Sequence, residues 1–105
     1  MDELLAMIKE IDIPFAYDHF AEGEPVDPPF ICYFMPQTDN FSADGTVYFP
    51  ASEVHVELYT DKKDLVSEQS VESALKGHEV FYNKYEAWID SEKLYQVLYI
   101  FEWRI

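Results

Sequence analysis

Basic residues are scarce in this chain and absent from most of its first half. The 105 residues include seven Lys and Arg against 21 Asp and Glu, which gives a formal net charge of −14. No Lys or Arg occurs between Glu10 and Asp61. Nucleic-acid binding requires a basic surface, so the sequence predicts no specific binding to DNA or RNA. The excess of acid either maintains solubility, repels a polyanion or meets a basic partner.

Cysteine, glycine and long apolar runs are equally scarce. The one cysteine, Cys32, excludes an intrachain disulfide and a Cys-rich zinc site, and its apolar surroundings predict burial. Three glycines leave no room for a Gly-rich phosphate loop. No apolar run reaches the length that spans a bilayer, and no signal peptide is recognisable. We therefore expect no membrane partner and a start in a reducing cytoplasm.

Signals of catalysis and metal binding are missing as well. None of the three histidines lies four residues from another. His55 has Glu53 and Glu57 on its own strand face, but an exposed strand histidine explains this pattern better than a metal site. Residues 40–45 approach a calcium-binding loop, yet the position of the bidentate acid falls on Ala51. The sequence therefore predicts no catalytic residue, no cofactor, no metal and no enzyme activity.

Two helices are predicted in a single domain that spans residues 1–105. Apolar residues at helical spacing predict a helix over 2–11 with Asp2 as its N-cap. A second helix is predicted over 64–76, capped by Asp64 or Asp61 and followed by Gly77 at C′. Its apolar stripe combines four residues, namely Val71, Ala74, Leu75 and either Leu65 or Val66.

Strands are predicted at 13–20, 30–35 and 52–60, and as a final hairpin of 79–89 and 94–104 around the turn 90–93. The apolar run 30–35, bounded by Pro29 and Pro36, is typical of a central strand buried on both faces. Along 52–60 one face carries Val54, Val56 and Leu58, and the other carries Glu53, His55, Glu57 and Tyr59. Residues 37–46 are predicted to form a loop, with a short extended piece at 47–49.

The resulting order α-β-β-β-α-β-β predicts an α+β fold, with a mainly antiparallel sheet of four to five strands and both helices on one face. The last strand is apolar on both sides. One side carries Tyr95, Val97, Tyr99, Phe101 and Trp103, and the other includes Leu98 and Ile100. Either its long side chains lie flat on an outer sheet face, or another subunit buries that face.

Several stretches of the sequence together resemble a known family. They are residues 13–14, 16–17, 19–20, 28–30 and 33, then 39–44 with 47–49, and finally 56–64 and 90–99. The resemblance covers nearly the whole chain. It is to small tail-module proteins of long-tailed phages and prophages of Gram-positive bacteria, which in size and element order are similar to tail-completion, or tail-terminator, proteins.

This resemblance implies a ring, typically hexameric, at the head-proximal end of a phage tail. Such a ring ends tail-tube growth and meets the head connector, so the implied partners are further copies of the chain, tail-tube protein and head-connector protein. Assembly would take place in the host cytoplasm before incorporation into the virion, and a neighbouring role in head–tail joining stays open. The candidate subunit-contact residues are Asp39, Asn40, Phe41, Asp44, Tyr59, Tyr99 and Trp103.

Two further hypotheses accompany this reading, and two alternative functions stay open. Part of the 10–61 stretch would line the lumen of the ring and repel DNA. The loop 37–45 would be flexible alone and would order against a neighbouring subunit, with Phe41 as its apolar anchor. The main alternative function is an acidic DNA mimic that inhibits a host DNA-binding enzyme, and it would place acids on one continuous face. A small metal-dependent hydrolase is the other alternative, and it would require metal affinity through His55.

Overall fold

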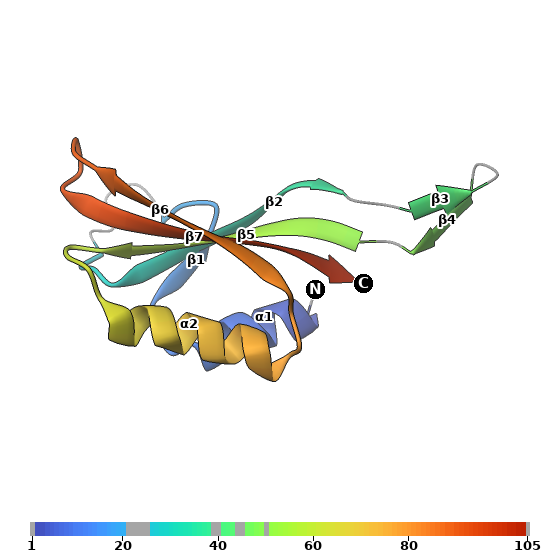
Figure 1. The fold of residues 1–105 in the computed structure, drawn as a ribbon, viewed down its shortest axis with the longest axis horizontal. Coiled ribbons are helices and arrows are strands. Elements are labelled where there is room, and N and C mark those ends of the chain that lie inside the picture. The colour runs from blue at the N-terminus through green and yellow to red at the C-terminus, as the bar shows by residue number, and fades with distance from the viewer. Residues whose placement is uncertain (1, 21–25, 39–40, 44–45, 50, 105) are drawn as a thin grey trace.

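Two helices lie against one face of a five-stranded sheet in the computed structural model (Figure 1). The structure describes residues 2–20, 26–38, 41–43, 46–49 and 51–104, which extend over 48 × 29 × 24 Å. Helix α1 spans Asp2–Glu10 and helix α2 spans Leu65–Gly77. In the described part of the chain, no helix is long and apolar enough to cross a membrane.

The sheet has the strand order β1-β2-β5-β7-β6. Its members are β1 (Phe15–Tyr17), β2 (Phe30–Thr38), β5 (Ala51–Thr60), β6 (Tyr82–Ile89) and β7 (Leu94–Arg104). Only β1 runs parallel to its neighbour; the β2–β5, β5–β7 and β6–β7 pairs are antiparallel. The predicted α+β class, the helices on one face and the element order are thereby confirmed for this sheet.

Alternation along the central strands places the core between the sheet and the helices. Val54, Val56 and Leu58 of β5 are fully buried, as predicted from the pattern. The neighbouring strand β7 adds Val97, Tyr99 and Phe101 to the same side. Leu4, Met7 and Ile8 of α1 and Val71 and Leu75 of α2 fill the layer from the helix side.

Strand β2 differs from its prediction in length and position. It continues through Pro36, because the register shifts between Phe34 and Gln37 and this irregularity accommodates a residue without an N–H. It also pairs between β1 and β5, so β5 and not β2 is the middle strand. The predicted end at residue 35 is therefore wrong, whereas β2 is an interior strand as predicted and is buried on both faces at Ile31, Cys32 and Tyr33.

A second, two-stranded sheet replaces the loop predicted at 37–46. Strands β3 (Phe41–Ala43) and β4 (Thr46–Phe49) pair antiparallel, and the extended piece expected at 47–49 is part of β4. Figure 1 shows these strands, which we call the arm, beyond the end of β2 and β5 and away from the helices. The two strands of the arm are therefore defined by their pairing with each other.

Helix α2 begins as predicted but ends differently. The Ser67 backbone N–H donates to Asp64 Oδ1 at 3.0 Å, which makes Asp64 the N-cap. At the other end, Glu79 takes the left-handed conformation with φ of 56°. Its N–H bonds to the Lys76 carbonyl and the Val80 N–H bonds to the Leu75 carbonyl, which is the Schellman pattern. Glu79 and not Gly77 is therefore the C′ residue.

The buried stripe of α2 is only partly the predicted one. Val71, Ala74 and Leu75 are buried as expected. Leu65 and Val66 are 68% and 76% exposed, so neither completes the stripe. The buried positions in the first turn are Ser67 and Glu68, because Glu68 has cationic partners beneath the helix. The predicted N-cap role of Asp2 in α1 concerns a side chain outside the described part.

Candidate interaction surfaces

The sheet face turned away from the helices carries a mixed polar and aromatic surface, here called the open face. It is formed by alternate residues of the two middle strands, which are Glu53, His55, Glu57 and Tyr59 of β5 and Gln96, Leu98 and Ile100 of β7. All of these side chains are half-buried. Tyr59, a predicted contact residue, lies on this face.

Hydrogen bonds join the polar groups of the open face to one another. Tyr59 Oη donates to Glu57 Oε1 at 3.2 Å, and Gln96 Nε2 donates to Glu57 Oε2 at 3.1 Å and to Tyr59 Oη at 2.9 Å. The Phe30 ring stacks on the Tyr59 ring with 5.0 Å between centroids. Burial raises the pKa of Glu57, and burial together with the adjacent Glu57 raises the pKa of Tyr59 to about 12. This surface is thus organised by contacts within the chain.

An ion-pair network stands on the helix side of the sheet. Glu68 is 2% exposed and pairs with Lys63 at 2.9 Å and with Lys84 at 2.8 Å. Lys84 also pairs with Glu72, which accepts a 2.8 Å hydrogen bond from the Tyr99 hydroxyl. The network ties α2 to β6 and β7.

Tyr99 belongs to this network and to the core. Its side chain is fully buried beneath α2, and burial raises its pKa. A side chain with no exposed surface cannot touch a neighbouring subunit, so the prediction of Tyr99 as a contact residue is corrected to a core role. The sequence pattern placed Tyr99 on the same strand side as Trp103, but it could not show that α2 covers that part of the strand.

The side chains of Cys32 and His55 are both largely buried. Cys32 is 7% exposed, as predicted, and burial with Glu57 and Asp18 nearby raises its pKa to about 11, so the thiol stays protonated near neutral pH. His55 Nε2 lies 2.7 Å from Glu53 Oε1. Its side chain is only 18% exposed, so the expectation of an exposed histidine is wrong. Among the described residues, no three His, Cys, Asp or Glu side chains form a group that could hold a metal ion.

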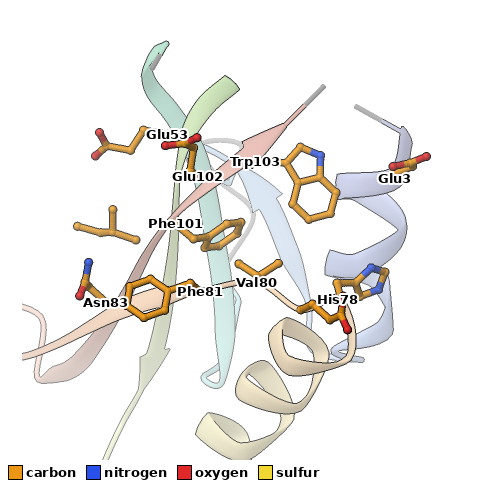
Figure 2. A pocket seen from close by; sticks show the side chains of 11 residues that line it. Glu3, Glu53, His78, Val80, Phe81, Asn83, Phe101, Glu102 and Trp103 are labelled. Carbon is orange, nitrogen blue, oxygen red and sulfur yellow. The ribbon is translucent and has the colours of Figure 1, made fainter. Parts of the chain in front are cut away.

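A groove of about 800 Å³ lies at the end of the sheet where the C-terminal part of β7 passes the start of β6 (Figure 2). The β6–β7 pairing reaches only Tyr82 and Phe101, whereas β7 continues alongside β5 to Arg104. The groove is lined by Glu3, Glu53, His78, Glu79, Val80, Phe81, Asn83, Ile100, Phe101, Glu102 and Trp103. Trp103, predicted as a contact residue, is therefore a groove residue.

The remaining predicted contact residues belong to the sequence of the arm or lie next to it. Asp39, Asn40 and Asp44 lie outside the described residues, and Phe41 begins β3 with a side chain outside the described part. Of the three predicted contact side chains that the structure describes, Tyr59 lies on the open face, Tyr99 in the core and Trp103 in the groove. Sequence reasoning missed the groove residue Phe81, which is 86% exposed. The predicted strand 79–89 included Phe81, whereas β6 begins at Tyr82 and leaves Phe81 in the link that follows α2.

The comparisons with known proteins give a fold likeness. No protein-family model matches this sequence, and no curated protein matches it. The chain is similar to a chain in a structure described as the virion of a native gene transfer agent (GTA) particle, with a TM-score of 0.62 and 10% sequence identity. The match covers 96% of this chain and 82% of the other. At this identity the comparison shows a shared fold.

Proposed function

We propose that the chain is a non-enzymatic structural protein of a phage-like particle that forms a ring at the head-proximal end of the tail. The ring ends growth of the tail tube and joins it to the head connector. The observation that carries this proposal is the fold shared over 96% of the chain with a protein of a gene transfer agent virion. The sequence resemblance to phage tail-module proteins supports the same role.

The shape of the subunit supports ring formation. Closed rings use two different surfaces of each subunit, one meeting the other on the neighbour. The arm, which extends beyond the end of β2 and β5, and the open face are two such different surfaces (Figure 1). A two-stranded hairpin is marginally stable by itself, so the arm gains stability by packing on a neighbouring subunit. Phe41 with Asp39, Asn40 and Asp44 would make this contact, and Tyr59 would be part of the receiving surface.

The acidic stretch supports a role as a DNA conduit. The region between residues 10 and 61 has no Lys or Arg, and Asp12 and Asp18 are exposed carboxylates within it, away from the open face. Carboxylates facing a lumen repel DNA phosphates over about 8–10 Å at physiological salt. A lumen with this charge lets DNA pass without binding it. We therefore place part of this stretch toward the lumen in the proposed ring.

Electron microscopy and native mass spectrometry test the ring. The purified chain, alone and mixed with the tail-tube protein of the same particle, should form closed rings, with six subunits expected on the tube. Phe41→Ser should abolish rings, because it removes the apolar anchor of the arm. Phe81→Ser is the matched control, since it removes an exposed Phe outside the arm, and rings should persist. A chain that forms no ring in either setting and is absent from purified particles refutes the proposal.

The second candidate is an acidic DNA mimic, and the net charge of −14 is the observation in its favour. A mimic presents carboxylates in place of phosphates on a continuous surface. On the open face, however, Glu53 and Glu57 alternate with His55 and Tyr59, and Glu57 lies opposite Leu98. A nuclease protection assay separates the two candidates. Stoichiometric inhibition of a host nuclease by the isolated chain, without ring formation, would favour the mimic.

A further inference from the structure

Strand β6 forms one edge of the main sheet. It pairs with β7 on one side, and the strand order places no described strand on its other side. The side chains from Asn83 to Trp88 are all exposed, so neither helix covers this edge. Among them, Tyr85 is 56% exposed and Trp88 is 46% exposed. The edge therefore presents backbone N–H and C=O groups that no described strand pairs with, next to two aromatic side chains.

The two edges of the sheet differ in how well they could accept another strand. The opposite edge, β1, has three residues, and a short edge strand offers little to pair with. Strand β6 has eight residues and no proline, and it pairs with β7 without a shift in register. Lys84 and Glu86 are its only charged residues, and both contact oppositely charged side chains of their own chain on the helix side. Strand β6 is therefore a long, regular edge with no net charge.

The sequence of β6 is complementary to itself in one antiparallel register. A twofold axis between two such strands passes through a residue, because opposite residues point to the same face. With the axis at Lys84 or Glu86, like charges lie directly opposite each other, which destabilises the pair. With the axis at Tyr85, Lys84 lies opposite Glu86 of the second copy, and Tyr82 lies opposite its Trp88. Each of these favourable contacts occurs twice, and an axis nearer either end of β6 would pair fewer residues.

We propose that β6 pairs with β6 of a second copy of this chain, antiparallel about a twofold axis at Tyr85. The two five-stranded sheets then form one continuous sheet, with the helices of both copies on the same face. The net charge of −14 opposes association, but exposed charges more than about 8–10 Å apart are largely screened at physiological salt. Just before the strand, Phe81, which is 86% exposed, falls opposite Ile89 of the second copy.

This contact goes beyond the proposed ring and does not depend on it. A ring joins two different surfaces of neighbouring subunits, whereas here one strand meets its own copy. The tests therefore use the Phe41→Ser variant, in which ring formation through the arm should be lost. A dimer of this variant supports the β6 contact, while the ring is tested separately with the unchanged chain, so the two failures are distinguishable.

Disulfide cross-linking tests the position of the axis. Tyr85→Cys places a thiol opposite the same residue of the second copy, where the Cα atoms of an antiparallel pair lie about 4.5–5.5 Å apart. This separation allows a disulfide, so mild oxidation should give a covalent dimer. Cys32 is 7% exposed, so the chain without the Tyr85→Cys change should stay uncross-linked.

Ala87→Cys is the matched control on the same strand and the same sheet face. In the proposed register its two copies are offset along the strands by about 13 Å, so it should not cross-link to itself. Asn83 of one copy lies opposite Ala87 of the other. A mixture of Asn83→Cys and Ala87→Cys should therefore cross-link, although neither variant does so alone. All three positions are exposed, so circular dichroism should show a folded chain in each case.

Charge substitution tests the register independently of the cysteines. Glu86→Lys places like charges opposite each other at both copies of Lys84 and should weaken the dimer by about tenfold. Glu92→Lys makes the same change in net charge, but it lies in the β6–β7 turn outside the paired stretch. It should not weaken the dimer, because it only reduces the repulsion between two acidic chains. Sedimentation velocity over a series of protein concentrations measures both effects.

Three results would overturn the proposal. A Phe41→Ser chain that stays monomeric at every concentration, with no cross-link through Tyr85→Cys, would mean that β6 does not pair with a second copy. Equal cross-linking of Tyr85→Cys and Ala87→Cys would mean that the axis does not lie at residue 85. Dimers of equal strength in Glu86→Lys and Glu92→Lys would mean that the copies associate through another surface.

Discussion

The two faces of the sheet are made by the same strands but differ in how they hold polar groups. On the helix side, Glu68 is almost fully buried and is compensated by two lysines. On the open face, Glu57 is half-buried and is held by the neutral groups of Tyr59 and Gln96. The helix side therefore stabilises a charged carboxylate, whereas the open face disfavours one.

This difference separates a fully packed core on the helix side from a partly exposed surface that is suited to contact with another protein. The helix side has buried apolar residues and compensated charges, so nothing further is gained by covering it. The open face leaves Leu98, Ile100 and Tyr59 partly exposed on a five-stranded sheet. Covering these side chains removes apolar area from water and favours association. Four pairs of substitutions test this contrast. In each pair, one residue is buried on the helix side and the other lies on the open face or is more exposed.

The largest effect is expected from two leucines on neighbouring strands. Leu58 is fully buried on the helix side, and Leu98 is half-buried on the open face. Leu58→Ala should lower the free energy of unfolding by about 2–5 kcal/mol, because a cavity remains in the core. Leu98→Ala should cost about 1 kcal/mol. Urea unfolding of the monomer measures both. Equal losses would show that the open face is already covered in solution.

The buried carboxylate should give the next largest effect. Glu68→Gln removes the charge that Lys63 and Lys84 compensate, and should lower the free energy of unfolding by about 1–3 kcal/mol. The control is Glu86→Gln, since Glu86 pairs with the same Lys63 but is 43% exposed. It should cost at most about 1 kcal/mol. The two variants change the chain by one charge each, so an equal loss would argue against a special role for burial.

Two tyrosines make a smaller, matched comparison. Tyr99 donates to Glu72 at 2.8 Å inside the core, and Tyr59 donates to Glu57 at 3.2 Å on the open face. Tyr99→Phe should cost about 1 kcal/mol of unfolding free energy, because Glu72 loses a buried donor. Tyr59→Phe should cost about half of that or less, since water can replace the hydroxyl. Thermal unfolding of both variants measures the two losses. A larger loss for Tyr59→Phe than for Tyr99→Phe would contradict the greater burial of the helix side.

The smallest effect is a pH dependence of opposite sign on the two faces. Burial raises the pKa of Glu68, but hydrogen bonds and charges from Lys84 and Lys63 outweigh it and hold the pKa below its ordinary value of 4.5. Its stabilising effect is therefore present above pH 4.5 and is lost as the pH falls through the lowered pKa. The pKa of Glu57 is raised by burial above the same ordinary value. Its ionisation therefore costs stability as the pH rises through the raised pKa.

Glu57→Gln should accordingly raise the melting temperature at pH 7. This advantage should vanish below about pH 4.5, where wild-type Glu57 is protonated in both states. Glu68→Gln should do the opposite, with a loss at pH 7 that shrinks as the pH falls. Melting temperatures of wild type and both variants between pH 3 and pH 7 provide the measurement. A destabilised Glu57→Gln at pH 7 would show that the open face favours the charged form.

Local sequence signals predicted the elements whose pattern is strong and continuous. The alternation over 52–60 identified both faces of β5, and Asp64 was recognisable as an N-cap. These features depend on residues within a few positions of each other, so a single sequence contains them. The helix end was misplaced because Gly77 was the obvious candidate, whereas Glu79 adopts the left-handed conformation that the Schellman hydrogen bonds require.

The interaction surfaces were harder to predict because they depend on elements distant in sequence. The groove is lined by residues from the start of α1, the end of α2 and parts of β5, β6 and β7. No short sequence motif indicates that these elements lie together. The arm was predicted as a loop, because its residues carry turn signals and pair only with each other. The contact roles of Asp39, Asn40, Phe41 and Asp44 stay predictions.

The sequence by itself determined the buried face of β5, the α+β order and the uneven acidic charge, because these follow from periodicity and residue type. The tertiary structure alone decided which face of β7 the helices cover. It buried Tyr99, left the open face of β5 half-exposed and collected Phe81, Trp103 and Glu79 around one groove. The reason is that a strand presents both faces alike until a helix packs on one of them, and that packing depends on contacts between residues far apart in the chain.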